Sequence, residues 1–215
     1  DWKSNFRPLS HFVKYSLGAV YLVTALFLGN WALKDYQVFR LVQSKEGGVQ
    51  NLERAVKLQP MNSESWHRLG WEYLKENPDE TRASALKTKA LEAFQKAVQL
   101  SPTYSRYWFS LGRLEYQEGR TQQAIFSLEQ AAAWAPHQAG YLLHLIALNL
   151  KASEESRTDE ERNRYLQQAR EFFEKLSRIK TFPDIEQQKR WMGQVYTEKF
   201  QQLIPYWNLN RKAGP

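Results

Sequence analysis

The stretch SRYWFSLGRLEYQEGRTQQAIFSLEQAAAWAPHQ, residues 105–138, decides the fold of this chain. Its pattern predicts two antiparallel helices joined by a turn at residues 118–120. Gly112 and Ala124 are small and are expected where the two helices cross, so that the backbones can approach closely. Pro136 lacks a backbone donor and disfavours helix in the residue before it, so it ends the second helix. A hairpin of this kind cannot bury its apolar face alone, which predicts stacked copies along the chain.

A second copy precedes this stretch. The first-helix pattern W-x-x-L-G-x-x-Y and the second-helix pattern recur at Trp66, Leu69, Gly70, Tyr73, Ala90, Phe94, Ala97 and Pro102. Pro102 and Pro136 lie 34 residues apart, and the copy carries eight extra residues between Lys75 and Lys89. These residues resemble the tetratricopeptide repeat (TPR) family, which has a 34-residue period.

The resemblance implies an all-α fold, a TPR-type solenoid of three to four helical hairpins closed by a capping helix. The expected units are a degenerate repeat 29–62, a repeat with an insertion 63–104, the repeat 105–138, a degenerate repeat with an insertion 139–183, a capping helix 184–203 and a tail 204–215. In the first unit, Leu52 and Ala55 take the core positions of the second helix and Phe39 takes the aromatic position of the first. In the fourth unit, the charged segment 153–162 is expected to form a turn.

Before the repeats, a basic flank (residues 1–14) leads into YSLGAVYLVTALFLGNWAL, residues 15–33, which carries no charge. A helix of this length approaches the roughly 30 Å thickness of the hydrocarbon core of a bilayer. Lys14 and Lys34 bound the stretch, and aromatic residues stand at both of its ends, as in membrane-spanning helices. We therefore expect a single transmembrane helix that continues into the first repeat. The alternatives are a helix buried in a larger assembly and a signal peptide, for which residues 29–31 are a poor cleavage site.

The positive charges on the two sides of this helix do not decide its orientation. Three Lys and Arg residues lie on each side, so the positive-inside rule gives a tie. We expect the repeats outside the cytoplasm because bacterial anchors of this kind are common there. The chain begins at Asp1 without an initiator methionine, so we expect a processed protein, an engineered piece or part of a longer protein.

The charge distribution argues against nucleic acid as a partner, although the net charge is +7. Residues 1–60 hold eight Lys and Arg against four Asp and Glu, whereas the remaining residues hold 22 against 19. The excess therefore lies beside the apolar helix, where anionic lipids attract it.

No set of residues suggests catalysis or a cofactor. The chain has no cysteine, which excludes disulfides, zinc–thiolate sites and a thiol nucleophile. None of the four histidines has a second ligand four residues away on a predicted helix, and no phosphate-binding loop occurs. We expect no enzyme, no metal and no cofactor.

Binding of protein partners is what the TPR resemblance implies. The first-helix positions that line the concave groove in the family correspond here to Glu64, His67, Trp71, Leu74, Arg106, Phe109, Arg113 and Tyr116. We expect Trp71, Phe109 and Tyr116 to be exposed together as anchors, flanked by the two arginines, which would suit an acidic or aromatic-bearing segment. The alternative is that the groove is filled by the chain's own C-terminal helix or tail.

The resulting hypothesis is a non-catalytic scaffold that is anchored in the membrane by residues 15–33 and assembles or stabilises a membrane-associated protein complex. An alternative is the accessory C-terminal tail of a multi-spanning protein, because an apolar span that runs into TPR units also resembles O-antigen ligases and polymerases. A soluble co-chaperone is a third interpretation, which the charge-free stretch disfavours. The carboxylate clamp of such co-chaperones needs Lys and Asn at set groove positions, and Leu74 and Tyr116 are apolar there.

Overall fold

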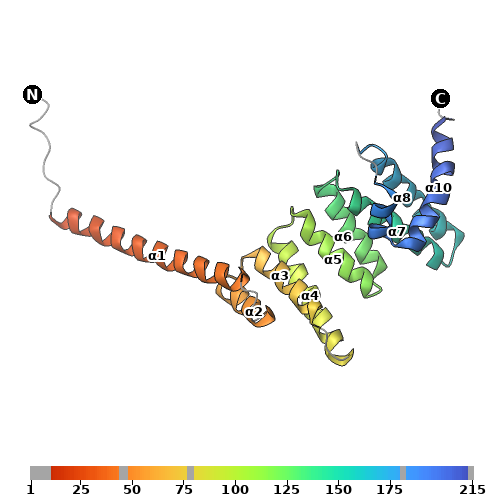
Figure 1. The fold of residues 1–215 in the computed structure, drawn as a ribbon. Helices are drawn as coiled ribbons and strands as arrows, with labels where there is room; N and C mark the ends of the chain where they lie inside the picture. The colour runs from red at the N-terminus through yellow and green to blue at the C-terminus, as the bar shows by residue number, and fades with distance from the viewer. Residues whose placement is uncertain (1–10, 44–47, 77–79, 180–182, 213–215) are drawn as a thin grey trace, which may run out of the picture.

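The computed structural model describes residues 11–43, 48–76, 80–179 and 183–212 of the chain, and in these ranges every regular element is an α-helix. The helices are α1 (His11–Gln43), α2 (Gly48–Leu58), α3 (Ser63–Lys75), α4 (Glu80–Leu100), α5 (Ser105–Gln117), α6 (Thr121–Trp134), α7 (Ala139–Glu155), α8 (Asp159–Leu176), α9 (Ile185–Met192) and α10 (Gln194–Lys212). Helices α2 to α10 pack into an elongated body, and α1 projects from one end of it (Figure 1).

Helix α1 is 33 residues long, and its side chains over residues 15–37 are exposed. Among the described helices it is the one that is long and apolar enough to cross a membrane, judged by length and composition. Its last turns belong to the solenoid, because Val38 is buried where α1 contacts α2. The same helix is therefore an isolated rod at its start and half of the first hairpin at its end.

Three further hairpins follow, formed by α3 with α4, α5 with α6 and α7 with α8. In two of them a glycine lets the paired helices approach closely. A Cβ atom added at Gly70 would lie 2.6 Å from Cε1 of Phe94, and one added at Gly112 would lie 3.0 Å from Cγ of Leu128 and 3.1 Å from the carbonyl oxygen of Ala124. These positions leave no room for a side chain. The predicted all-α solenoid of helical hairpins is confirmed.

In the second and third hairpins, the tryptophan of the first helix ties the hairpin to the turn before it. Nε1 of Trp66 donates a hydrogen bond of 2.8 Å to the carbonyl oxygen of Pro60, and Nε1 of Trp108 donates one of 2.7 Å to that of Pro102. A buried or half-buried indole needs a partner for its N–H group. Here that partner is the carbonyl group six residues earlier, so the indole also holds the turn in place.

The buried apolar side chains form two clusters that meet at α5. One cluster extends from α2 to α5 and contains the fully buried Phe94, and the other extends from α5 to α10 and contains the fully buried Phe200. Helix α5 contributes Leu114 to the first cluster and Phe109 to the second. The hydrophobic core is therefore continuous along the solenoid.

The first hairpin differs from the sequence prediction in register. Leu52 and Ala55 are buried in α2, as predicted. The core position predicted for Phe39 is wrong, because its side chain is 59% exposed and Val38 is buried instead. One residue turns a helix by about 100°, so the family pattern, carried over without a gap, selected the wrong face of α1.

The predicted charged turn over residues 153–162 is also wrong. Helices α7 and α8 extend into this segment from both sides and leave only residues 156–158 between them. The hydroxyl group of Thr158 accepts a hydrogen bond from the backbone N–H of Glu161 and caps α8. Three acidic residues follow in the first turn of α8, where they interact favourably with the helix dipole. The extra residues therefore lengthen the helices.

The C-terminal region forms two helices in place of the single predicted helix 184–203. Asp184 caps α9, and Gly193, with φ 77°, separates it from α10. Within the predicted tail 204–215, α10 continues through Pro205 to Lys212. Pro205 lies inside α10, where a proline removes one backbone hydrogen bond and clashes with the carbonyl group four residues earlier.

Replacing Gly70 tests the close approach of the paired helices. Gly70→Ala should lower the free energy of unfolding by about 1–3 kcal/mol, because the added methyl group meets the buried ring of Phe94. Urea denaturation followed by circular dichroism measures this change. Gly18→Ala is the control, since a Cβ atom there meets nothing within 4 Å. An unchanged free energy of unfolding in Gly70→Ala would show that the hairpin tolerates a wider separation.

Candidate partner-binding groove

A groove of about 750 Å³ lies along α3 and α5, and the last residues of α1 and the first part of α2 form one of its ends. Five of the eight residues that the sequence predicts for partner binding line this groove: Glu64, His67, Trp71, Arg106 and Phe109. They come from the first helices of two successive hairpins, so the side-by-side packing of α3 and α5 brings them together.

The other three predicted residues, Leu74, Arg113 and Tyr116, do not line the groove. Leu74 and Tyr116 are half-buried and pack against the two hydrophobic clusters. The ammonium group of Lys151 lies 4.6 Å from the centre of the Tyr116 ring. Tyr116 is thus part of the packing between hairpins.

Phe109 contradicts the prediction that three aromatic side chains are exposed together. Its side chain is 8% exposed and belongs to the second hydrophobic cluster. The ring stacks on Tyr141, with centres 4.7 Å apart, and lies 5.2 Å from the ring of His144. Helix α7 covers Phe109 because the next hairpin stacks directly against α5. Trp71, which is half-buried, is the aromatic side chain that keeps access to the groove.

Arg113 is held between aromatic rings beside the groove. Its guanidinium carbon lies 5.6 Å from the centre of the Trp71 ring and 5.8 Å from that of Phe109. Neither Arg113 nor Arg106 forms an ion pair with a described residue. The stacking fixes the position of the Arg113 cation and leaves its hydrogen-bond donors for another group.

His67 joins the two hairpins inside the groove. Nε1 of Trp71 donates a hydrogen bond of 3.1 Å to Nε2 of His67, so this nitrogen carries no proton and also accepts the hydroxyl proton of Ser110 at 2.9 Å. Its ring is 4.8 Å from that of Tyr107 and 5.6 Å from that of Phe94. Burial lowers the pKa of His67 to about 4; Glu64 acts against this shift, and Arg106 and Arg68 add to it. His67 is therefore a neutral acceptor in the packed interior.

The sequence prediction missed Arg68, which also lines the groove. Its Nε donates a hydrogen bond of 2.9 Å to Glu64, and its Nη1 donates one of 3.1 Å to the carbonyl oxygen of Val42 at the end of α1. The spacing of four residues between Glu64 and Arg68 could have indicated the first contact. The contact with Val42 depends on how α1 and α3 pack, for which the sequence carries no local signal.

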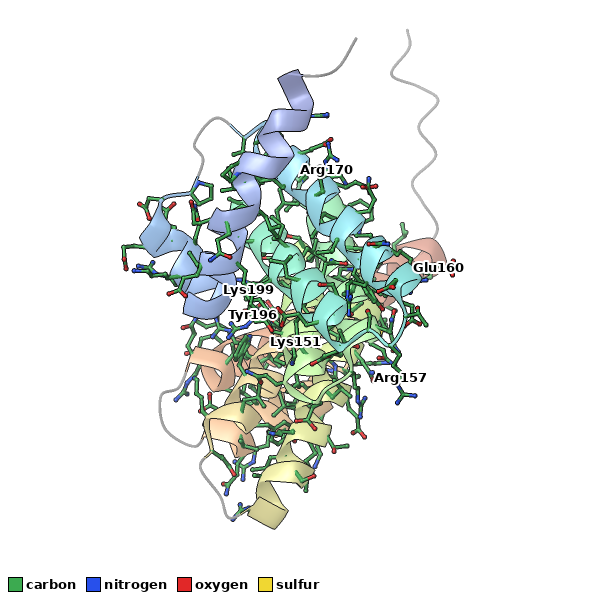
Figure 2. All side chains as sticks on the ribbon, turned by 90° about the vertical axis from the view of Figure 1, so that its right-hand side faces the viewer. Lys151, Arg157, Glu160, Arg170, Tyr196 and Lys199 are labelled. Atoms are coloured by element: carbon green, nitrogen blue, oxygen red, sulfur yellow. The ribbon has the colours of Figure 1, made fainter. Side chains whose placement is uncertain are left out.

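The C-terminal helices meet the solenoid away from this groove. Figure 2 shows Lys151, Tyr196 and Lys199 close together where α7 and α10 meet. Lys199 pairs with Glu154, its ammonium group lies 5.3 Å from the centre of the Tyr196 ring, and burial raises the pKa of Tyr196 to about 12. No residue of α9 or α10 is among those that line the groove. The described part of the C-terminal region therefore leaves the groove open.

The described residues contain no cluster of three or more His, Asp or Glu side chains that could hold a metal ion. The buried acid Glu115 accepts a hydrogen bond of 2.7 Å from the hydroxyl group of Ser127, and burial raises its pKa. This contact joins α5 to α6 within one hairpin and lies away from the groove lining.

Stability should fall in mild acid because of His67, which is buried, and His144, which is half-buried. Burial lowers the pKa of His67 and of His144 to about 4, against 6.5 for the unfolded chain. Between these values the unfolded state binds more protons, so the stabilisation is complete above about pH 6.5 and is lost as the pH falls towards 4. Each histidine contributes at most about 1.4 kcal/mol per pH unit to the slope.

Urea denaturation at a series of pH values measures this slope. His67→Phe keeps a ring in the same space and should reduce the slope between pH 6.5 and 4. His137→Gln alters an exposed residue and is the control. A slope that does not change in His67→Phe would mean that His67 is solvated in the folded chain.

The comparisons with known proteins agree with this architecture. Residues 105–138 match the tetratricopeptide repeat family. A crystal structure of MamA is similar over 79% of this chain and 91% of its own, with 19% identity and a TM-score of 0.50.

Two further solved structures resemble the chain less. MamA from residue 41 to its end, from Desulfovibrio magneticus RS-1, has 17% identity and a TM-score of 0.46 over 62% of this chain and 67% of its own. TTC0263, a thermophilic TPR protein of Thermus thermophilus, has 23% identity and a TM-score of 0.41 over 56% of this chain and 70% of its own. No curated protein matches the sequence. Residues 105–138 are thus similar to a tetratricopeptide repeat, and the chain shares with MamA a solenoid fold of helical hairpins.

Proposed function

We propose that the chain is a non-catalytic, membrane-anchored scaffold that binds a partner protein through the groove along α3 and α5 and helps to assemble or stabilise a membrane-associated complex. The observation that carries this proposal is the pair Arg106 and Arg113. Arg106 lines the groove and Arg113 lies beside it, held by two rings, and neither forms an ion pair with a described residue.

The chemistry of the groove favours a partner segment that carries carboxylates. A guanidinium group binds a carboxylate through two parallel hydrogen bonds. Because stacking on Trp71 already restricts Arg113, less side-chain entropy is lost when it binds. The other charges in the groove are paired, Arg68 with Glu64 and Lys75 with Glu72, so the unpaired arginines determine which charge is attracted.

Trp71 supplies the apolar part of the same surface. Half-buried aromatic side chains near the centre of an interface contribute a large share of the binding free energy. Its indole N–H is already bonded to His67, so the partner meets the ring and does not have to satisfy its donor. We propose that a partner segment places an apolar side chain against Trp71 and a carboxylate on Arg113.

The anchor in this proposal is the apolar part of α1. Residues 15–33 carry no charge, and Tyr15 and Trp31, at its two ends, are 75% and 60% exposed. Interfacial aromatics of this kind and flanking lysines are typical of helices that span a bilayer. We propose a single span, with the repeats outside the cytoplasm.

Photo-crosslinking in native membranes tests the proposed groove. A benzoylphenylalanine placed at Arg106 should form a covalent adduct with a membrane-associated protein, which mass spectrometry identifies. The control is the same probe at Gln95, which is exposed on α4 and does not line the groove. Equal adducts from both positions, or none from Arg106, would contradict a partner in this groove.

Charge reversal then tests the role of Arg113. Arg113→Glu should reduce recovery of the same partner at least about tenfold, which corresponds to about 1.4 kcal/mol. Arg164→Glu is a matched control, because Arg164 also lies over an aromatic ring, 5.2 Å from that of Tyr165, and does not line the groove. If both variants bind equally, Arg113 does not contact the partner.

The alternative is an accessory tail of a multi-spanning O-antigen ligase or polymerase-like protein. The intact mass of the polypeptide distinguishes it from the scaffold. The intact mass of the chain purified from native membranes would then exceed that of the 215 residues by further hydrophobic spans. A mass that matches these residues, together with co-purified partners, would support the scaffold.

A further inference from the structure

The turns of the solenoid fall on two opposite edges, because successive helices run in opposite directions. One edge holds the turns that link one hairpin to the next, at residues 59–62, 101–104 and 135–138. We call it the linking edge. The opposite edge holds the turns within hairpins, at residues 118–120 and 156–158. In Figure 1, α3, α4, α5 and α6 lie side by side with their ends on these two edges.

The linking edge starts where the apolar stretch of α1 ends. The side chain of Gln59, in the first linking turn, donates a hydrogen bond of 3.2 Å to Asp35 of α1. Asp35 follows Leu33 by two residues, which is about 3 Å along a helix. A headgroup layer is about 5–8 Å thick, given about 30 Å of hydrocarbon in a bilayer of about 40–45 Å. If residues 15–33 fill the hydrocarbon, this turn lies among the headgroups.

The second linking turn lies next to the start of α3, which follows the first linking turn. The opposite edge has contacts of its own. The hydroxyl group of Ser101 donates a hydrogen bond of 2.9 Å to that of Ser63, the first residue of α3. On the other edge, Lys87 pairs with Glu118 at 3.0 Å. Linking turns therefore lie next to linking turns along one edge, and the turns within hairpins lie along the other.

The linking edge carries exposed apolar side chains. Met61 is 78% exposed, Tyr104 is 47% exposed and Trp134 is 52% exposed. Beyond α1, the large apolar side chains that are exposed among the described residues are these three together with Leu58 and Phe126, and Leu58 also lies at this edge. Tryptophan and tyrosine are the residues that membrane–water interfaces favour.

Charge separates the two edges further. The three linking turns contain no charged residue, whereas the turns within hairpins carry charges at Glu118, Arg120 and Arg157. Lys34, Lys57 and Arg178 flank the linking edge and form no ion pair with a described residue. Anionic headgroups attract such cations within a Debye length of the surface.

We propose that the linking edge is a second membrane contact, at which Met61, Tyr104 and Trp134 enter the interfacial layer and the flanking cations bind anionic headgroups. This inference rests on the proposed role of α1 as the anchor and goes beyond it, because it fixes the orientation of the whole solenoid. The solenoid lies along the bilayer on its linking edge, and the turns within hairpins point away from the membrane.

The absence of cysteine from the chain allows a direct test by single-cysteine labelling. Met61→Cys, Tyr104→Cys and Trp134→Cys, each in the full chain, are labelled with the fluorophore NBD and reconstituted in nanodiscs of phosphatidylcholine with phosphatidylglycerol. Lipids that carry a nitroxide near the headgroup serve as quenchers. We expect a blue-shifted emission and the loss of most NBD fluorescence at all three positions, with weaker quenching in phosphatidylcholine alone.

Two sets of labelled positions keep the outcomes distinct. Gln117→Cys and Arg157→Cys report on the opposite edge and should stay unquenched, and Val23→Cys, paired with lipids that carry the nitroxide on the acyl chain, reports on the proposed span. If the linking edge behaves like the opposite edge while Val23 is quenched, the second contact is wrong and the anchor stands. If Val23 is not quenched either, both the proposed membrane span of α1 and the proposed second contact are wrong. Equal quenching in the two lipids would overturn the role of anionic headgroups.

Discussion

The close approach of paired helices at Gly70 and Gly112 is the constraint on which the other features of the structure depend. A side chain at either position would meet the ring of Phe94 or the backbone and side chains of α6. Because each hairpin is tight, its second helix can be filled with small residues such as Ala90 and Ala124, both fully buried. Tight hairpins then bring α3 and α5 side by side, and the groove forms along these two helices.

The groove has a rigid polar interior, with Arg106 in its lining and Arg113 beside it, and both cations lack acidic partners among the described residues. His67 can accept hydrogen bonds from Trp71 and Ser110 at the same time only because burial keeps its ring neutral. This contact joins consecutive hairpins and leaves Trp71 with its N–H satisfied and its face towards Arg113. The order of the groove therefore comes from neighbouring repeats and not from flexible loops, which is the arrangement expected of a preorganised binding surface.

The sequence predicted the fold well where small and large residues alternate at family spacing, as around Gly112. It failed at Phe39, where one residue of register decides which face of α1 is buried and no glycine marks the crossing with α2. The charged segment before α8 was mistaken for a turn, since charged residues suit the first turn of a helix as well as a loop. The resemblance to the TPR family also indicated eight site residues, five of which line the groove. It cannot show that Tyr141 covers Phe109 or that Arg113 lies over two rings, because these contacts join different hairpins.

Helix α1 runs to Gln43 without a break between its apolar part and the part that packs against α2. With α1 as the anchor that we propose, there is no hinge between the bilayer and the first hairpin, so the solenoid cannot swivel independently of the rod that carries it. When α1 rotates about its own axis, the solenoid and its groove rotate with it around that axis. The groove would then stay at a constant distance from the bilayer. A partner in the same bilayer would reach it by diffusion in the plane of the membrane.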